Sequence, residues 1–332
     1  GIYSNACADS KGNLWIATEG YGLLSYHPST RESQFYLLDK NSPSRYNSNI
    51  IKTIIPDKNH LWCGTANGEI YRFDLHTHTF TLFYKYPEKS VIYALLLDSH
   101  GNLWSSTIRS SCGLTCFTPD GKILNSFKNN QDKKLSISGI RCLFEERPGV
   151  LLVGTRSNGL YRYDLDSKVL THYSKEEPVS SGRYIPGNYI SSIDRLKSGE
   201  IWVSTYGNGI FRFSESSGMS THVTQKEGLI DNSVCKLIAG HDGNLWMSST
   251  IAISVYNPQT GEVRNYERAN GVDAREFTLH GGVNMPDGTI CFTANDGFIT
   301  FQPLNIQINK FVPPIVFKQL SVNNKLISPG DD

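Results

Sequence analysis

Few residues of this 332-residue chain are spaced for catalysis or metal binding. His76 and His78 form the only close histidine pair, and strand-like alternation would put both rings on one side, which suits weak metal binding. They lie in a polar segment, so a solvated turn is the better interpretation. His241 and His280 stand alone and are expected to be packing or surface residues. Because GxSxG, HExxH, P-loop and dinucleotide motifs are also absent, we expect neither catalysis nor a metal or other cofactor in this chain.

The seven cysteines favour packing over a disulfide framework. They are odd in number and scattered, and most fall in apolar, strand-like segments, where a thiol acts as a small hydrophobic group. Only Cys112 and Cys116 are close. Residues four apart along a strand are ~13 Å apart, too far for a disulfide unless the chain folds back.

A third group of residues suits the binding of a small polar ligand. Tyr and Arg residues recur in short segments rich in Gly, Asn and Ser, and these side chains can stack on sugars and recognise carboxylates or hydroxyls. For the Gly and Asn residues themselves, turn geometry is the better explanation. The candidate ligand-binding residues are Glu19, Tyr21, Arg109, Arg156, Tyr206 and Arg275.

An internal repeat positions these candidates. Each of the five tryptophans, from Trp15 to Trp246, follows Leu or Ile in a short phrase that ends in Thr or Ser. Two degenerate copies, with Leu152 and Cys291 in place of Trp, make seven copies that are 42–50 residues apart. A second marker, an aromatic residue about eleven positions after each anchor, confirms the register: Tyr26, Phe73, Phe117, Tyr163, Phe213, Tyr256 and Phe301.

Each copy predicts four short strands. Strand A is the apolar segment before a turn, strand B contains the Trp, strand C ends at the aromatic residue, and strand D follows a polar turn. The expected D strands are 35–38, 80–84, 123–127, 170–173, 221–224 and 263–266. Seven such units predict an all-β fold, a seven-bladed β-propeller of four-stranded blades, with the Trp residues packed between neighbouring blades. The seventh copy has no obvious D strand, so its blade has three strands or receives one from before Gly1.

The propeller is expected to span residues 1–310, and residues 311–332 to begin a separate β-sandwich domain with Asn323-Asn324 as a turn. In a propeller, strand A lines the central channel, and the B–C and D–A loops share one face. The candidate residues would therefore surround one mouth of the channel, together with the D–A segments Arg45-Tyr46 and Arg183-Tyr184.

Charge and hydropathy exclude several classes of function. The net charge is +1, with 32 Lys and Arg against 31 Asp and Glu, which argues against nucleic-acid binding and against a polybasic membrane surface. No apolar run approaches the roughly 20 residues that span a bilayer. Both ends stop abruptly in strand-like sequence, so we expect a piece of a longer protein.

The phrases GNLWIATEGYGLLSYHP and GEIWVSTYGNGIFRF resemble the two-component-regulator propeller repeat. The tail PPIVFKQLSV is similar to the start of the immunoglobulin-like sandwich that follows the last propeller in that family. This resemblance implies the periplasmic sensor region of a bacterial hybrid two-component system, in which a histidine kinase and response regulator relay the signal to transcription control. It also implies an oligosaccharide or other small-molecule ligand and allows a homodimer of the full-length receptor.

Two other functions stay open at this point. The domain can be a structural or dimerisation propeller without a small-molecule site, which a broad apolar patch on a blade edge would favour. Streptogramin lyases are also seven-bladed propellers and use a His with a metal near the central channel. Their repeat phrase differs, and no equivalent His-and-acid pair is found here. A cluster of Tyr and Arg at one channel mouth would favour ligand sensing.

Overall fold

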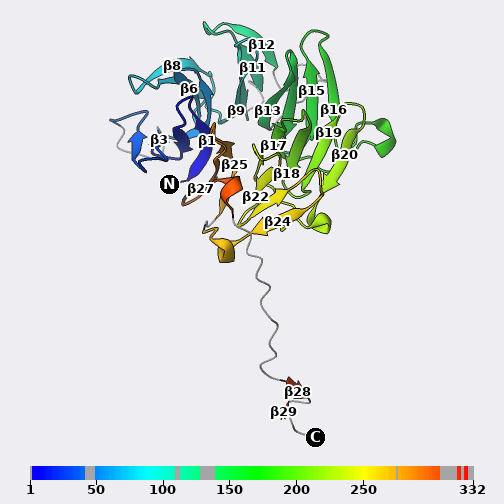
Figure 1. Cartoon of the computed structure of the whole chain (residues 1–332). Helices are drawn as coiled ribbons and strands as arrows, with labels where there is room; N and C mark the ends of the chain where they lie inside the picture. Colours follow the sequence, from blue (N-terminus) through cyan, green and yellow to red (C-terminus); the bar gives the residue numbers. More distant parts are fainter. Residues whose placement is uncertain are drawn as a thin grey trace.

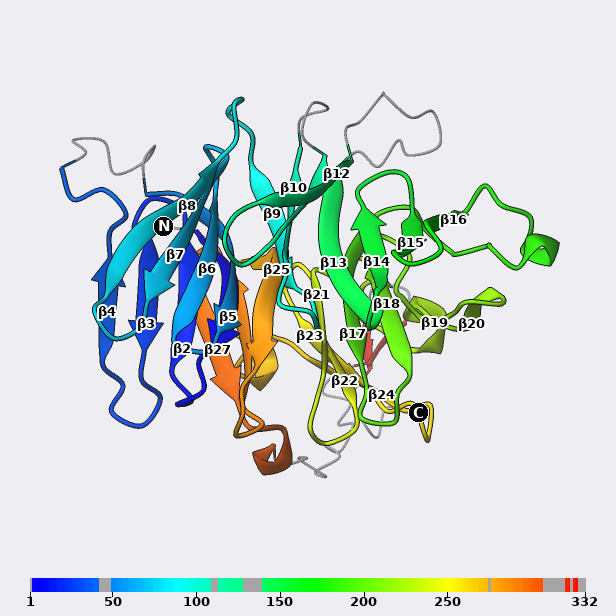
Figure 2. The same ribbon diagram turned by 90° about the horizontal axis from the view of Figure 1, so that it is seen from above.

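The computed structural model describes residues 2–41, 49–108, 113–127, 139–273 and 276–306, and the backbone of residues 320–322 and 325–327. Seven antiparallel sheets surround a central channel as the blades of a propeller (Figure 1). Figure 2 shows the blades from the side, with their strands running between two opposite faces. The predicted all-β, seven-bladed architecture is therefore confirmed.

The innermost strand of each blade lines the channel and contacts the innermost strand of the next blade. These strands are β1 (Tyr3–Ala8), β5 (Ile51–Asp57), β9 (Ile92–Leu97), β13 (Ile140–Arg147), β17 (Ile190–Arg195), β21 (Lys236–Ala239) and β25 (Phe277–Asn284).

The second strand carries the Trp phrase and is buried almost throughout, because neighbouring blades cover both of its faces. The second strands are β2 (Leu14–Thr18), β6 (His60–Thr65), β10 (Leu103–Thr107), β14 (Val150–Thr155), β18 (Ile201–Thr205), β22 (Leu245–Ser248) and β26 (Ile290–Ala294).

The third and fourth strands complete the blades outward. The third strands are β3 (Leu23–Tyr26), β7 (Glu69–Asp74), β11 (Leu114–Phe117), β15 (Leu160–Asp164), β19 (Ile210–Ser214), β23 (Ile253–Tyr256) and β27 (Gly297–Phe301). The outer strands are β4 (Ser33–Tyr36), β8 (Thr79–Lys85), β12 (Ile123–Phe127), β16 (Val169–Tyr173), β20 (Gly218–Val223) and β24 (Val263–Tyr266). They confirm the six expected D strands within a few residues at each end.

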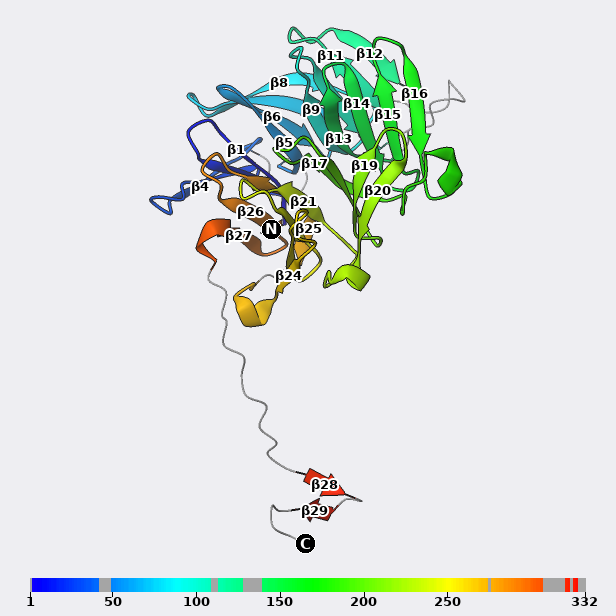
Figure 3. The ribbon, with the colours of Figure 1, turned by 45° about the vertical axis from the view of Figure 1, so that its right-hand side comes forward.

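Four short 3-10 helices lie in the connections that the structure describes: η1 (Val179–Ser181), η2 (Gln225–Glu227), η3 (Arg268–Asn270) and η4 (Pro303–Asn305). A further antiparallel pair, β28 (Leu320–Val322) and β29 (Lys325–Ile327), flanks the predicted turn at residues 323–324 (Figure 3). Among the described residues, no helix has the length and apolar character that crossing a bilayer requires.

The tryptophans pack between neighbouring blades, as predicted. Trp15 contacts Ile54 and Phe73 of the next blade, and Trp104 packs with Leu151 and Val153 of β14. Burying such large aromatic side chains removes much apolar surface from water and fixes the angle between blades.

Four of the five indoles also donate a hydrogen bond to a carboxylate in the preceding turn. Trp104 Nε1 lies 2.9 Å from Asp98 Oδ2, and Asp98 Oδ1 accepts the backbone N–H groups of His100 and Asn102. Asp9, Asp98 and Asp242 therefore hold both the A–B turn and the Trp, whereas Asp57 accepts from the Trp62 indole. Blade five is the exception, because Leu196 takes the position of the Asp and Trp202 Nε1 is buried without a partner.

Packing between the first and last blades closes the ring. β1 lies against β25 (Figure 1). The rings of Tyr26 and Phe298 are 5.1 Å apart, next to the buried side chain of Met285. In the described part of the chain the seventh blade has three strands, in the order β25-β26-β27, which agrees with the absence of a D-strand signal.

Candidate functional site

Two cavities lie along the channel, both lined by described residues. The upper cavity opens at the face of the B–C and D–A loops, has a volume of about 400 Å³ and is lined by residues from the first and third to seventh blades and by Lys52 of the second. The lower cavity opens at the face of the A–B turns and has a volume of about 690 Å³. Tyr93, Arg141 and His280 line both cavities, so these three side chains form the boundary between them.

β-Bulges direct side chains of the inner strands into the channel. In five blades one residue near the start of strand A has no partner opposite it on strand B, because the register shifts there by one position. An extra residue of this kind re-aims its side chain and bends the strand. The bulge residues are Ser4, Lys52, Tyr93, Arg141 and Ser191.

A second repeated contact places the rim residues. The residue that follows strand B donates its backbone N–H to the residue just before strand A of the same blade. Arg156 donates to Gly139 and Tyr206 to Tyr189, both over 2.9 Å. The rim side chains are therefore held next to the bulge residues by backbone hydrogen bonds.

Blades three to five bring aromatic rings and guanidinium groups together on one side of the upper cavity. We call this set, Tyr93, Arg141, Arg156, Tyr189 and Tyr206, the tyrosine–arginine wall. The rings of Tyr189 and Tyr206 are 5.4 Å apart, and the Arg141 guanidinium carbon lies 4.0 Å from the centre of the Tyr93 ring. Burial raises the pKa of the Tyr189 hydroxyl, while the nearby charges of Arg141 and Arg156 act in the opposite direction.

The acidic residues of the upper cavity are already engaged. Glu19 forms an ion pair with Lys52, and Glu276 accepts a hydrogen bond of 2.7 Å from the Asn295 amide. The side chains of Arg141 and Arg156 form no ion pair or hydrogen bond among the described residues. The described lining of the upper cavity therefore carries three cationic side chains, Lys52, Arg141 and Arg156, against the two carboxylates of Glu19 and Glu276, an excess of one positive charge.

His280 crosses the channel between the two cavities. It belongs to a four-residue bulge of β25, has a left-handed φ of 68°, and its Nδ1 donates to the Ser191 carbonyl oxygen over 2.7 Å. Because a carbonyl oxygen only accepts, this bond fixes the tautomer with the proton on Nδ1. Desolvation in the channel lowers the pKa of His280 to about 3, so the imidazole is neutral at ordinary pH.

The lower cavity has a different character. Strand A side chains such as Ile54, Leu95 and Ile193 cover much of its wall. Asp194 accepts two backbone N–H groups, including that of Ala239 over 2.8 Å. Desolvation raises the pKa of Asp194 and lowers that of Lys236, although each charge favours the ionised form of the other.

The structure brings together three of the predicted binding residues and leaves one aside. Glu19, Arg156 and Tyr206 line the upper cavity. Tyr21 instead packs against Phe35, with the two ring centres 5.6 Å apart, and does not line the cavity. Arg109 and Arg275, like the Arg45-Tyr46 segment, lie outside the described residues. Arg183, in the D–A loop of blade four, pairs with Glu177 at 3.2 Å and is not part of the cavity wall.

Sequence reasoning missed Tyr93, Arg141 and Tyr189. The repeat contains a signal for Tyr93 and Arg141. Each directly follows an isoleucine of strand A, Ile92 or Ile140, that pairs with the last Thr of strand B. The sequence analysis treated these segments as apolar strands. It therefore did not predict that a bulge turns one polar side chain of each segment toward the channel.

The structure also shows the surroundings of the histidine pair and of the cysteines. The His78 ring packs against Tyr36, with centres 4.9 Å apart, and His76 is exposed in the polar turn after β7. The thiols of Cys7, Cys63, Cys116, Cys235 and Cys291 are buried and free. Burial raises the pKa of Cys116 and Cys235 to about 12, which keeps both thiols protonated. Cys112 lies outside the described residues.

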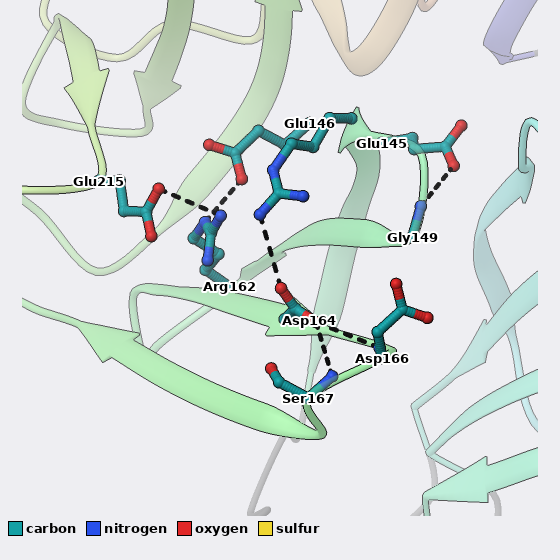
Figure 4. A network of polar contacts seen from close by, with 9 residues as sticks. Glu145, Glu146, Gly149, Arg162, Asp164, Asp166, Ser167 and Glu215 are labelled. Carbon is teal, nitrogen blue, oxygen red and sulfur yellow. Dashed lines mark hydrogen bonds and ion pairs between the residues drawn. The ribbon is translucent and has the colours of Figure 1, made fainter.

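A second buried arginine of blade four provides a reference for Arg141. Arg162 of β15 lies between Glu146 and Glu215, with Nε 2.6 Å from the first carboxylate and Nη2 3.2 Å from the second (Figure 4). Glu146 lies near the end of β13, next to the A–B turn, and Glu215 follows β19, so this network joins blades four and five.

Sequence comparison finds a similarity to a histidine kinase. This chain aligns over its whole length, at 24% identity over 344 residues, with the protein named Histidine kinase P4 of Formosa agariphila. The chain spans 24% of the length of that relative. No protein-family model matches the chain.

Solved structures with the same fold include extracellular domains of two putative hybrid two component systems from B. thetaiotaomicron. One is 21% identical with a TM-score of 0.53 and the other 18% identical with a TM-score of 0.51. The matches cover 98% and 99% of this chain but only 46% and 55% of those chains. These matches confirm the resemblance to two-component-system propellers that the sequence repeat indicated. At these identities, they establish that the propeller fold is shared.

A lyase also shares the fold. A catalytically inactive variant of virginiamycin B lyase from Staphylococcus aureus is 16% identical with a TM-score of 0.69, and the match covers 90% of this chain and 94% of that one. In the channel described here, the imidazole of His280 bonds to a backbone carbonyl rather than to a carboxylate.

Proposed function

We propose that this chain is the ligand-sensing propeller of a bacterial hybrid two-component sensor, that it lies in the periplasm, and that its ligand is a carbohydrate fragment. The full-length histidine kinase would relay binding to transcription control. The fold shared with extracellular domains of putative two component systems and the alignment with a histidine kinase support the sensor role. Residues 311–332 would begin the β-sandwich domain that follows.

The tyrosine–arginine wall is the observation that carries the ligand-binding part of this proposal. Aromatic rings offer apolar faces to the C–H face of a sugar, and guanidinium groups donate fixed pairs of hydrogen bonds to its oxygens. A cavity of about 400 Å³ is within the range of small-molecule sites. Backbone hydrogen bonds hold the rim residues in place, so little ordering is needed when a ligand binds.

Calorimetric titration with a panel of neutral and acidic oligosaccharides tests this proposal. Tyr206→Ala should weaken binding about tenfold, since one aromatic contact is worth roughly 1 kcal/mol or more. Arg183→Ala is the matched control, because Arg183 shares the loop face but does not line the cavity. Absence of binding across the panel, or equal binding by Tyr206→Ala, would contradict a site at this wall.

A dimerisation propeller is the second candidate, and one observation favours it. The outer strands of blades one to four expose large apolar side chains, namely those of Phe35, Leu82, Ile123 and Val169. Their exposed fractions lie between 46% and 54%. Sedimentation of the wild type and of Leu82→Glu separates the two candidates. A dimer that this change disrupts, together with no ligand binding, would establish the scaffold role.

A further inference from the structure

Arg141 differs from Ser4, Lys52 and Ser191, the other non-aromatic residues that these bulges direct into the channel. Ser4 Oγ donates to the Ile51 carbonyl over 2.9 Å, Lys52 pairs with Glu19, and Ser191 Oγ bonds to Ser204 Oγ over 2.9 Å. Arg141 is only 8% exposed, yet its Nε is buried without a hydrogen-bond acceptor. Stacking on Tyr93 is the interaction that the described protein provides for its charge.

A buried charge without a counter-ion costs folding free energy, because the protein replaces neither its hydration nor its hydrogen bonds. Stacking on a tyrosine offsets part of this cost and leaves the guanidinium edge free to donate. In the part of the chain that the structure describes, no carboxylate forms an ion pair with Arg141. His280 donates its Nδ1 proton elsewhere, and the carboxylates of Glu19 and Glu276 are held by Lys52 and Asn295.

We propose that Arg141 is the binding site for an anionic group of the ligand, a carboxylate or a sulfate ester, at the inner end of the upper cavity. This inference rests on the proposed function and narrows its ligand class to acidic sugars. The planar guanidinium can present two parallel N–H donors to two oxygens of such a group. Tyr189, Tyr206 and Arg156 then contact the remainder of the ligand nearer to the rim.

Paired ligands that differ only in charge test the proposal. Galacturonate oligosaccharides and their methyl esters are titrated into the wild type, and galactose 6-sulfate beside galactose distinguishes a sulfate from a carboxylate. The acid or the sulfate should bind about 10- to 100-fold more tightly than its uncharged partner, because a hydrogen bond to a charged group contributes about 1.5–3 kcal/mol. Arg141→Gln should abolish this preference. Arg141→Lys should retain part of it, since it keeps the charge but loses the paired donors.

Two controls separate loss of the site from loss of the fold or of general charge. Lys226→Gln removes a positive charge from the same face outside the cavity and should leave the preference unchanged. Thermal melting of Arg141→Gln should show a Tm equal to or above that of the wild type, because the change removes an uncompensated buried charge. Addition of inorganic sulfate should raise the Tm of the wild type but not that of Arg141→Gln.

The outcomes distinguish this inference from the broader proposal. Equal binding of acids and esters, unaffected by Arg141→Gln, overturns the anion site and leaves a neutral-sugar sensor. Sulfate stabilisation that depends on Arg141, without binding of any sugar, supports the anion site and overturns the carbohydrate proposal. If no sugar binds and sulfate does not raise the Tm, both the anion site and the carbohydrate proposal are overturned.

Discussion

Blade four buries two arginines, Arg141 and Arg162, in contrasting surroundings. Arg162 on β15 lies between two carboxylates that come from two blades: its Nε donates to Glu146 and its Nη2 forms an ion pair with Glu215, so its charge is neutralised (Figure 4). Arg141 on β13 faces the channel and lies over a tyrosine ring without a carboxylate. A buried ion pair maintains the fold, because removing one partner leaves the charge of the other buried and unpaired. A buried charge without a partner reduces the stability of the folded protein, and binding of a ligand with the opposite charge best explains its presence.

The largest effect is expected from breaking the paired site. Arg162→Met leaves Glu146, whose side chain is 14% exposed, without its cation, and should lower the free energy of unfolding by about 3–5 kcal/mol. Denaturant unfolding measures this change. Replacing Glu215, which is 62% exposed, with Gln should cost far less. A loss below about 1 kcal/mol for Arg162→Met would show that the network does not hold the blades together.

His280 should make stability depend on pH because it is desolvated among positive charges. Its pKa is lowered from 6.5 to about 3, so between these values the unfolded chain binds a proton that the native state does not. The free energy of unfolding should therefore fall as the pH drops through this window, by about 1.4 kcal/mol per pH unit. His280→Gln should flatten this dependence, whereas the exposed His100→Gln should not. Denaturation series from pH 7 to 4 check both, and identical slopes for His280→Gln and wild type would refute the assignment.

The indoles offer the same contrast between paired and unpaired groups. Trp104→Phe removes the hydrogen bond to Asp98, whereas Trp202→Phe removes an N–H that has no partner. Both changes reduce apolar packing similarly, so Trp104→Phe should be the more destabilising by about 1–2 kcal/mol. Thermal or denaturant unfolding of the two variants measures the difference. Equal losses would mean that the Asp does not hold the Trp.

The smallest effect is expected at Arg141 itself. Arg141→Met keeps the aliphatic stem and removes the unpaired charge, so the free energy of unfolding without ligand should change by less than about 1 kcal/mol, or rise. The measurement is the one used for Arg162→Met, which makes the two substitutions a matched pair within one blade. A loss as large as that of Arg162→Met would give Arg141 a structural role.

Strong repeated signals made most of the fold predictable. The Trp phrase and the following aromatic residue set the blade register, and six outer strands agree with their expected positions. The B–C loops are equally recognisable, because each follows a Thr or another small residue, and Glu19, Arg156 and Tyr206 were predicted as binding residues from these loops. Tyr21 was placed by the same loop but packs against Phe35, since a side chain two positions farther along the loop faces another side of the blade.

The sequence by itself determined the number of blades, the strand order within each blade and the packing role of the tryptophans, because these depend on short-range patterns repeated seven times. Only the tertiary structure decided which polar residues meet in the channel. The position of Tyr93 and Arg141 after the branched residue of strand A marks the β-bulges, but it does not show which side chains meet across the channel. A carboxylate partner for a buried arginine comes from another strand or another blade. The contrast between Arg162 and Arg141 therefore exists only once the ring is closed, because it depends on contacts between residues far apart in the chain.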